Sequence, residues 1–551
     1  MKLNKFIILG AAAALTLSSC SESFLDVTSK TEPNSSNYYK TNTQAYRALL
    51  GCYDGWRQIA SNPGTYPIIL ASSIMSDECY GGAGAGDGKS AQVVDQFDPG
   101  VSGGEMNIYE QEWKDYYSGV YRCNYLIQEA GNIDWEDERQ QGIYIGEARA
   151  LRAIMYFDMV RLWGNIPLFL EPSNENKEQA DPADVYANIF SDLRYAIDNI
   201  PADMYTDVAD FGHVTKYAAE AIFARAYLYY TGYYKKEAKY VDGTTISKAD
   251  ALAACEDIIK SSRYSLVPEF KNLWPAASLV PIAGQNGWDT NLSTYAGDAN
   301  SEIVLAMLFT PSQDYDGNND SNRWLVNVGM RSLCYPPFGK GWGIATVTNY
   351  YQRKYFDDRD LRGPASVIDI YAEGPSTSPD FNASFKDWRE FTGLTMKKYC
   401  PVAFGNGNPA TKPDGTGDFM ITNPQPWIFV RYADVLLMAA ELGAPSAQAY
   451  LDMVRTRAGL PSVAPTFQNI MDERARELAY EGSRYWDLMR QGVEVMADAV
   501  VASAGKVQTA GNLDEVTYKR DQIIKTQGLS QIPQNQITLS HGVLKQNPGW
   551  Y

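Results

Sequence analysis

The sequence predicts a mainly α-helical protein, in which paired helices form a scaffold and a large loop-rich insertion carries short strands. Two observations lead to this fold class. Apolar and aromatic residues recur at helical spacing near both ends of the chain. Between about residues 265 and 426, Gly, Pro, Asn and Asp crowd the sequence and the helical runs become short.

The first half of the chain contains a series of helical patterns. In one of them Ala148, Leu151, Met155, Met159 and Leu162 step at three and four residues, and a Gly-Asn-Ile-Pro run then stops the helix. The predicted helices cover residues 43–52, 110–130, 142–163, 184–199, 215–233 and 248–260.

Small residues in the pattern at 215–233 indicate closely packed helices. Ala218, Ala221 and Ala224 are spaced at three beside large aromatic residues such as Tyr217 and Phe223. Such pairing of small with large side chains lets two helices approach, as in helical-hairpin repeats. The periodicity does not allow the repeats to be counted.

The middle of the chain combines loops with strand-like runs, of which 302–307 is the clearest. Binding residues tend to lie on loops that a rigid scaffold positions. Helical periodicity returns at Phe429 and holds to about Gly492, and a polar, irregular tail follows. We therefore expect a single domain over 20–551, with a helical scaffold at 38–264 and 427–495 and a loop-rich ligand region at 265–426. The middle region holds Trp274, Trp288, Trp324, Trp342 and Trp388.

The composition argues against several classes of protein. The 551 residues include 66 Asp+Glu and 48 Lys+Arg, so the formal net charge is −18, and a nucleic-acid partner is not expected. His213 and His541 are the only histidines, which excludes a His-rich metal centre. By contrast, 38 Tyr and 12 Trp provide abundant aromatic surface.

The N-terminus has the pattern of a bacterial lipoprotein signal peptide. Lys2 and Lys5 precede an apolar stretch, which ends in Leu-Ser-Ser before Cys20. We expect cleavage after residue 19 and acylation of Cys20, since two or three acyl chains give a stable anchor. An ordinary secretory cleavage is the alternative. The acidic start after Cys20 resembles the surface-export signal of Bacteroidetes lipoproteins.

The other six cysteines match no metal-binding spacing. They form no CxxC pair, and an exported chain can oxidise some of them, although the sequence does not give the pairing. They are Cys52, Cys79, Cys123, Cys255, Cys334 and Cys400.

Two loop motifs fall short of known ligand sites. The run 81–90 ends like a phosphate-binding loop, but Ala83 stands where the first glycine is required. The run 314–320 is rich in oxygen ligands but lacks the glycine and the distal glutamate of a calcium loop. We predict no cofactor and no metal, and calcium at 314–320 stays open as an alternative.

Three glutamates at helical spacing could be read as catalytic. Glu473, Glu477 and Glu481 are four residues apart within a helix predicted over 470–490, and glycosidases use paired carboxylates. Carboxylates one turn apart more often form ion pairs with neighbouring helices. The sequence offers Arg431, Arg455 and Arg457 as their partners.

Several segments carry a family resemblance. Upstream these are Glu147–Ala153 (EARALRA), Tyr156-Phe157 and Trp163–Leu168 (WGNIPL), and downstream Arg431–Glu441 (RYADVLLMAAE), Val454–Leu460 (VRTRAGL), Glu481–Arg490 (EGSRYWDLMR), Ile532-Pro533 and Gln546–Trp550 (QNPGW). In this order and with the lipobox, the chain closely resembles the SusD/RagB family of Bacteroidetes outer-membrane lipoproteins. Gln536, where the family commonly has Glu, and the terminal Trp550-Tyr551 are small departures.

The resemblance implies a non-catalytic protein that binds glycans at the cell surface. Family members have a tetratricopeptide-like helical scaffold and lie as a lid on a SusC-like TonB-dependent transporter, to which they deliver oligosaccharides. It therefore implies a lipid-anchored protein of the outer membrane that faces the cell exterior. The acidic charge favours a neutral polysaccharide or oligosaccharide as ligand.

In relatives the ligand surface combines a loop after the first helices with loops from the middle region. Here these correspond to 76–97, 322–325 and 338–343. Trp and Tyr rings stack on the apolar face of a sugar, while carboxylates accept hydrogen bonds from its hydroxyls. We predict Trp342, Trp324, Tyr80 and Trp288 as stacking residues and Asp77 as a hydroxyl acceptor, with burial of each Trp and helix capping by Asp77 as the alternatives. A peptide-binding member of the family and, further off, a glycoside hydrolase are the competing functions.

Overall fold

The computed structural model describes residues 38–61, 66–82, 88–280, 292–311, 320–331, 337–373, 392–402, 417–509 and 512–551. Helices dominate the first half, and each helix that the sequence predicts there is present. They are α2 (Asn42–Ser61), α3 (Ile68–Ile74), α4 (Lys89–Gln96), α5 (Glu110–Glu129), α6 (Glu138–Trp163), α7 (Pro182–Asn199), α8 (Lys216–Tyr233) and α9 (Lys248–Lys260).

Local capping explains where several of these helices begin. The Asp137 side chain accepts the N–H of Arg139 at the start of α6, and Thr215 accepts the N–H of Ala218 at the start of α8. Ser247 and Asp250 form a reciprocal capping box at α9. Such caps satisfy N–H groups that the helix itself leaves without partners.

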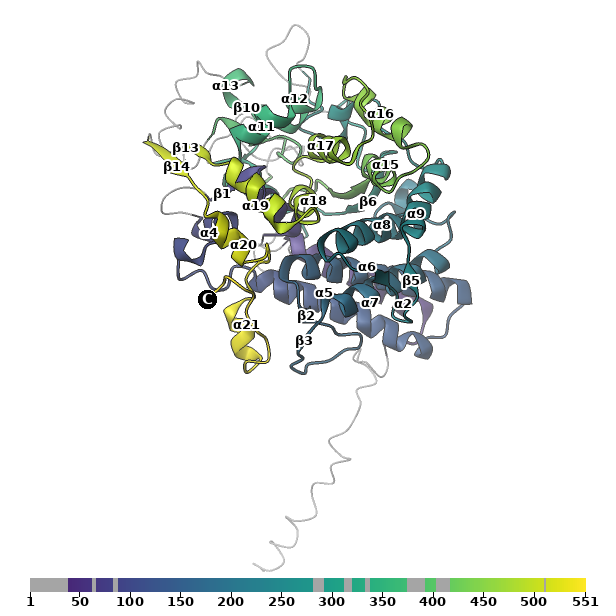
Figure 1. Cartoon of the computed structure of the whole chain (residues 1–551). Coiled ribbons are helices and arrows are strands. Elements are labelled where there is room, and N and C mark those ends of the chain that lie inside the picture. The colour runs from purple at the N-terminus through teal and green to yellow at the C-terminus, as the bar shows by residue number, and fades with distance from the viewer. Residues whose placement is uncertain are drawn as a thin grey trace, which may run out of the picture.

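Neighbouring helices in the chain also pack against each other in space. The pairs α5–α6, α6–α7, α7–α8 and α8–α9 are in contact, and α2 packs on α5 and α6 (Figure 1). The central helix α6 is buried almost all round from Ile143 to Trp163. The scaffold is therefore a layered stack of helical pairs.

Short elements follow α9. They are β6 (Ile303–Met307), α10 (Leu325–Val328), β7 (Met330–Arg331), β8 (Lys340–Gly341), β9 (Ala345–Val347), α11 (Asn349–Tyr355), α12 (Arg362–Ser366), β10 (Val367–Asp369), α13 (Ile370–Glu373) and β11 (Leu394–Met396). The strand predicted at 302–307 is confirmed by β6. It pairs antiparallel with β12 (Trp427–Arg431), a long-range ladder with two register shifts.

The helical pattern predicted from Phe429 begins later than expected. Residues up to Arg431 form β12, and helix α15 (Tyr432–Glu441) starts only after it. Every residue of β12 is buried. A fully buried strand has no alternation of polar and apolar residues, so its sequence cannot be distinguished from that of a buried helix.

The helix predicted over 470–490 is wrong as a continuous element. The chain forms α17 (Phe467–Glu477), a turn, and α18 (Arg484–Met489). Tyr480 and Gly482 have φ angles of 62° and 84° in that turn. A Cβ on Gly482 would lie 2.9 Å from the Cα of Ile69, so only glycine allows α3 to approach this closely.

The C-terminal tail is more ordered than its polar sequence suggests. After α16 (Ala447–Arg457), α17 and α18, the chain forms α19 (Val493–Ala502), the antiparallel hairpin β13 (Gly505–Thr509) and β14 (Asn512–Val516), α20 (Arg520–Lys525) and α21 (Gln534–Leu539). The prediction of an irregular tail is therefore corrected.

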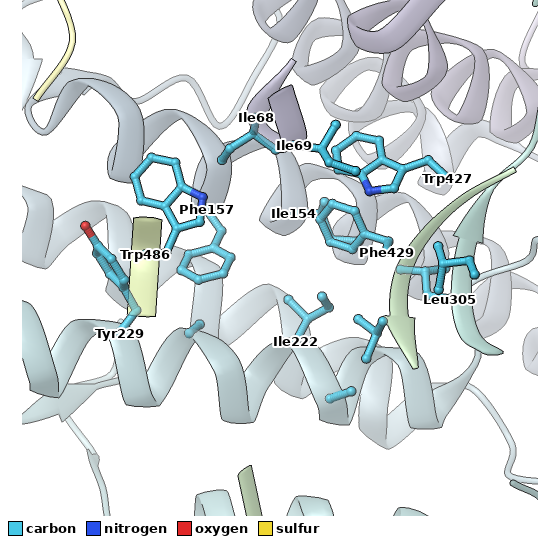
Figure 2. Packing of buried hydrophobic residues seen from close by; sticks show 14 of the residues in the cluster. Ile68, Ile69, Ile154, Phe157, Ile222, Tyr229, Leu305, Trp427, Phe429 and Trp486 are labelled. Carbon is cyan, nitrogen blue, oxygen red and sulfur yellow. The ribbon is translucent and has the colours of Figure 1, made fainter. Parts of the chain in front are cut away.

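One large hydrophobic core joins the two ends of the chain. Figure 2 shows Ile154 and Phe157 of α6 near Ile222 of α8, with Phe429 of β12 and Trp486 of α18 in the same cluster. Because N- and C-terminal elements share this core, neither end can be removed without exposing apolar surface. Within the ranges that the structure describes, no helix combines the length and apolar character needed to cross a bilayer.

Candidate functional site

The first predicted loop region pairs with a strand that directly follows the predicted run 338–343. Strand β1 (Cys79–Gly81), in the first region, pairs antiparallel with β9, so that Tyr80 lies opposite Thr346. The ladder continues through a hydrogen bond from the Gly82 N–H to the Ile344 carbonyl, at 2.8 Å. Segments more than 250 residues apart are thus brought to one place.

Trp342 lies on a backbone that its neighbours hold firmly. Its N–H donates to the Val326 carbonyl at 2.6 Å, and its own carbonyl accepts from the Arg331 guanidinium at 3.1 Å. A Cβ on Gly341 would lie 2.6 Å from the Cα of Gly329, so the two chain segments touch. The Trp342 side chain keeps part of its surface exposed. A partly open ring on a fixed backbone is suited to stacking on a ligand.

Phe419, an aromatic side chain that the sequence reasoning missed, lies close to this segment. The ammonium group of Lys340 is 4.8 Å from the centre of the Phe419 ring, and Phe419 is only partly buried. Lys340 stands two residues before Trp342 in the chain. This proximity could not be predicted from the sequence, because about 80 residues separate Phe419 from Lys340.

The predicted ligand roles of Tyr80 and Trp324 do not fit their burial. Tyr80 is 2% exposed and donates its hydroxyl to the Ser503 carbonyl at 2.6 Å, beneath hairpin β13–β14. Trp324 is 1% exposed and packs against the Tyr399 ring, with 4.8 Å between the centroids. In this structure neither ring offers a face to a sugar, because other parts of the chain cover both.

Asp77 is also unavailable as a hydroxyl acceptor in this structure. Its carboxylate is fully buried and accepts two hydrogen bonds from the Arg484 guanidinium, at 2.7 and 2.8 Å. The same guanidinium donates to the hydroxyl of Tyr355. Both carboxylate oxygens are therefore used within the fold. The alternative of a helix cap does not describe this contact either.

Glu78, the neighbour of Asp77, has an unusual environment. Burial raises the pKa of Glu78 to about 7, although its carboxylate accepts hydrogen bonds from the Tyr480 N–H at 2.7 Å and from the Ser73 hydroxyl at 2.9 Å. The nearby Asp77 charge acts in the same direction as burial. The folded protein therefore holds a proton on Glu78 that the unfolded chain releases at lower pH.

We expect the Glu78→Gln substitution to stabilise the protein at pH 8 by about 1–3 kcal/mol. Between the unfolded and folded pKa values the native state binds more protons, so its free energy of unfolding falls as the pH rises towards 7. Glutamine does not titrate, and its side chain can keep one hydrogen bond to the Tyr480 N–H and one to the Ser73 hydroxyl. Urea unfolding of both proteins at pH 5 and pH 8 measures the difference. Equal pH dependence in the two proteins would contradict the assignment.

The three glutamates considered as catalytic residues instead belong to a buried ion-pair network. Arg431 bonds to Glu477, to Glu481 and to Glu302, the last at 2.8 Å. Each of the three arginines predicted as a partner contacts at least one of the three glutamates. The network contains the cations Arg362, Lys398, Arg431, Arg455 and Arg457 and the anions Glu302, Asp360, Glu473, Glu477 and Glu481.

The network fixes the ionisation of its central carboxylate. Burial alone would raise the pKa of Glu477, but Arg457, Arg431 and Arg362 hold it well below its usual range. A carboxylate that stays ionised and is enclosed by guanidinium groups cannot act as a general acid. The structural interpretation of the three glutamates is the one that the contacts support.

His213, one of the two histidines, is held in a polar cluster. The Nδ1 atom of His213 lies 2.7 Å from the carboxylate of Glu147, which also accepts the hydroxyls of Tyr53 and Tyr205. The Tyr205 ring stacks on the imidazole, with 4.2 Å between the centroids. These contacts connect α2, α6 and the start of α8, so the cluster has a clear structural role.

Comparison with known proteins identifies the family. The model described as "SusD family" matches residues 345–550, and the model described as "Starch-binding associating with outer membrane" matches residues 89–228. Together the two stretches span more than half of the chain. The chain belongs to the SusD family.

Individual relatives agree with this assignment over nearly the whole chain. SusD-like protein P38 of Formosa agariphila is 25% identical over 520 residues, which cover 87% of this chain and 90% of the relative. A solved laminarin-binding SusD-like protein is 26% identical with a TM-score of 0.71, over 93% of this chain and all of the relative. Surface glycan-binding protein A from Bacteroides fluxus is 24% identical with a TM-score of 0.73, over the same shares. The tetratricopeptide-like helical scaffold expected of a SusD-family protein is confirmed.

The predicted ligand residues all lie outside the two stretches that match the family models. Residues 77, 80, 288, 324 and 342 precede residue 89 or fall between 228 and 345. The ion-pair network, apart from Glu302, lies within 345–550. In this SusD-family chain the matched parts thus hold most of the ion-pair network, and the predicted ligand residues lie before and between them.

Several predictions lie partly or wholly outside the described residues. Trp288 and Cys20 are both outside, as are most residues of the run 314–320. At the end of that run Asp320 forms an ion pair with Arg57. Among the described residues, no group of three or more His, Cys, Asp or Glu side chains is arranged to hold a metal ion. Lys89, in the glycine-rich run, donates to the side chain of Gln92 at 2.8 Å.

The scaffold also has a cavity lined by aromatic side chains, which was not predicted from the sequence. This cavity of about 290 Å³ lies between α5, the segment 167–177 and α21, and is lined by rings that include Tyr117, Tyr121 and Phe169. Two of its polar groups are occupied: the Tyr117 hydroxyl donates to the Pro167 carbonyl, and Lys177 donates to the Leu168 carbonyl. These bonds hold the segment 167–177 in place, and Trp342, which the sequence predicted, stays the candidate for a ligand contact.

Proposed function

We propose that this SusD-family protein binds a neutral polysaccharide or oligosaccharide at the cell surface and passes it, uncleaved, to a SusC-like TonB-dependent transporter. The observation that carries the proposal is the partly exposed Trp342 on its fixed backbone, in a chain whose family includes glycan-binding proteins. The description "Starch-binding associating with outer membrane" supports both the ligand class and the membrane association.

The chemistry of a sugar matches the residues around Trp342. The axial C–H bonds of a pyranose form an apolar face on which an indole ring stacks. Lys340, two residues before Trp342, and Arg331, which donates to the Trp342 carbonyl, carry the kind of donor that sugar hydroxyls accept. Stacking contributes roughly 1–2 kcal/mol per ring. A single contact of this size gives modest affinity, which several contacts along one polysaccharide would raise.

The proposal includes attachment of the mature chain to the outer membrane through acylated Cys20. Two or three acyl chains on one residue anchor a protein stably, whereas one chain does so only marginally. With the anchor on the outer face, the scaffold would place the Trp342 surface within reach of polysaccharide outside the cell. This part of the proposal rests on the lipobox at residues 17–20.

The proposal that the glycan is delivered without cleavage agrees with the ion pairing of Glu473, Glu477 and Glu481. A glycosidase needs an acid and a base that both face a substrate cleft. Glu473 and Glu477 are fully buried and ion-paired, and Glu481 is paired with Lys398 and Arg431. These glutamates, the candidates that the sequence offered, are committed to the fold.

We expect Trp342→Ala to weaken glycan binding about tenfold, since the loss of one stacked ring costs about 1.4 kcal/mol. Affinity gel electrophoresis against neutral polysaccharides, with laminarin first because a similar protein is named for binding it, identifies the ligand. Isothermal titration calorimetry then measures the dissociation constant for both proteins. The matched control is Phe467→Ala, which removes a 51% exposed ring from the start of α17, away from both candidate surfaces.

The outcomes separate the competing functions. Weaker binding by Trp342→Ala, with normal binding by Phe467→Ala and unchanged folding of both, would support the proposed surface. Equal binding by all three proteins would keep glycan binding but remove Trp342 from the site. Failure of the wild-type protein to bind any glycan, together with binding of peptides, would favour the peptide-binding alternative. Release of shorter sugars would contradict delivery without cleavage.

A further inference from the structure

Two cysteines face each other across the first pair of scaffold helices. Cys52 lies on α2 and Cys123 on α5, and both side chains are fully buried. In the structure both are free thiols. The helices pack closely along their length.

The crossing of these helices places the two thiols in register. A Cβ on Gly55 would lie 2.7 Å from the Cα of Gly119, so the two backbones touch there. The Arg122 guanidinium donates to the Gly51 carbonyl at 3.0 Å, one turn away from that point. Residues nearer the N-terminus of α2 therefore contact residues nearer the C-terminus of α5, so the two helices are antiparallel. Cys52 precedes Gly55 by three residues and Cys123 follows Gly119 by four, so both lie one turn from the contact on the same side.

The Cys123 thiol also influences the ionisation of Cys52. This neighbouring thiol, together with burial, raises the pKa of Cys52 well above its usual value. Cys52 also donates to the Ala48 carbonyl of its own helix. A disulfide requires Cα atoms about 4.4–6.8 Å apart, and only helices that pack as closely as α2 and α5 do at Gly55 and Gly119 allow such an approach.

We propose that Cys52 and Cys123 form a disulfide that ties α2 to α5 in the exported protein. Each thiol loses its hydrogen, a sulfur–sulfur bond forms, and the two electrons and two protons pass to an oxidising disulfide, which is reduced to two thiols. The inference rests on the export that the proposed function includes, since only an oxidising compartment supports such a bond.

Burial sets when the bond can form. The reacting species is a thiolate that an oxidant can reach, and in the folded protein the Cys52 thiol is neither ionised nor exposed. Oxidation therefore takes place before α2 closes onto α5. Once formed, the bond is protected from reductants by the same packing. It restrains the unfolded chain over a long loop, which is the case in which a disulfide stabilises most.

The experiment uses the mature chain, unfolded and then refolded with oxidised glutathione. Remaining thiols are alkylated in denaturant, and the intact mass and the unreduced peptide map are recorded. We expect the loss of two hydrogens, a peptide that links residues 52 and 123, and a higher urea midpoint than for protein kept in dithiothreitol. Cys255→Ala, which removes a fully buried cysteine from α9, should keep the link. Cys123→Ala should lose it.

The comparison of oxidised and reduced protein uses only the wild-type chain, so it does not depend on whether a variant folds. A refolded protein with all its thiols free, or with a link between another pair, would overturn the inference. Trapping thiols on intact cells tests the exported state, and labelling of the protein with a membrane-impermeant reagent shows separately whether it is exported. A surface-labelled protein with free Cys52 and Cys123 would overturn the disulfide while leaving the proposed function intact.

Discussion

The Glu477→Ala protein is expected to be less stable than the wild type by about 3–5 kcal/mol, because removing one partner leaves buried charges uncompensated. Glu477 contacts Arg362, Arg431 and Arg457, and all four side chains are almost wholly buried. Loss of its carboxylate would leave the other four anions of the network to compensate five cations. Equilibrium unfolding in urea at pH 7 measures the change.

The controls separate charge from packing. Glu477→Gln keeps the shape of the side chain and should still be strongly destabilised, since the missing charge is the cause. Glu494→Ala, on the exposed face of α19, should change stability by no more than about 0.5 kcal/mol. A Glu477→Ala protein within 1 kcal/mol of the wild type would show that the network is not maintained in solution.

Stability should also decrease in acid through this carboxylate. The arginines hold the pKa of Glu477 well below its unfolded value, so its contribution is present above the unfolded value. It is lost as the pH falls through that value and then through the folded pKa. Glu477 therefore acts in the opposite direction from Glu78, whose raised pKa makes the native state more stable as the pH falls towards 4.5.

The Asp77→Ala protein is expected to lose about 3–5 kcal/mol of stability, because Arg484 would remain buried without its carboxylate partner. The two hydrogen bonds between these side chains connect the segment before β1 to the start of α18, more than 400 residues away. The expected phenotype is poor folding rather than a defect in ligand binding. Thermal and urea unfolding of the variant measure the effect.

A double variant shows which role Asp77 has. Asp77→Leu with Arg484→Met replaces the ion pair by apolar side chains, and such replacements of buried pairs are often neutral or stabilising. We expect the double variant to recover most of the stability and to bind glycan like the wild type. A stable double variant that does not bind glycan would restore Asp77 as a ligand residue.

The pattern of helices could be read from the sequence because it is local. Periodic apolar residues, side-chain caps and the Gly-Asn-Ile-Pro stop mark α6 and its neighbours without reference to the rest of the chain. The turn between α17 and α18 shows the limit. The approach of α3, which begins about 400 residues earlier, leaves no room for a Cβ at Gly482, and no local pattern records that approach.

The candidate site divides in the same way. The sequence selected the runs 76–97 and 338–343, and β1 of the first run pairs with β9, which follows the second run directly. The sequence could not distinguish an aromatic ring that is exposed to solvent from one that other parts of the chain bury. Trp342 and Trp324 occur in similar loop contexts, yet Trp324 packs under Tyr399 and Tyr80 lies beneath the C-terminal hairpin.

The sequence by itself therefore determined the helical scaffold, the family, the arginine partners of the three glutamates and the lipobox. The tertiary structure decided which of the predicted side chains still reach solvent and which cysteines face each other. The physical reason is that periodicity and charge are properties of short segments, whereas exposure depends on what distant segments place over a side chain. Asp77 illustrates this: its chemistry suits a sugar hydroxyl, but the fold gives both of its oxygens to Arg484.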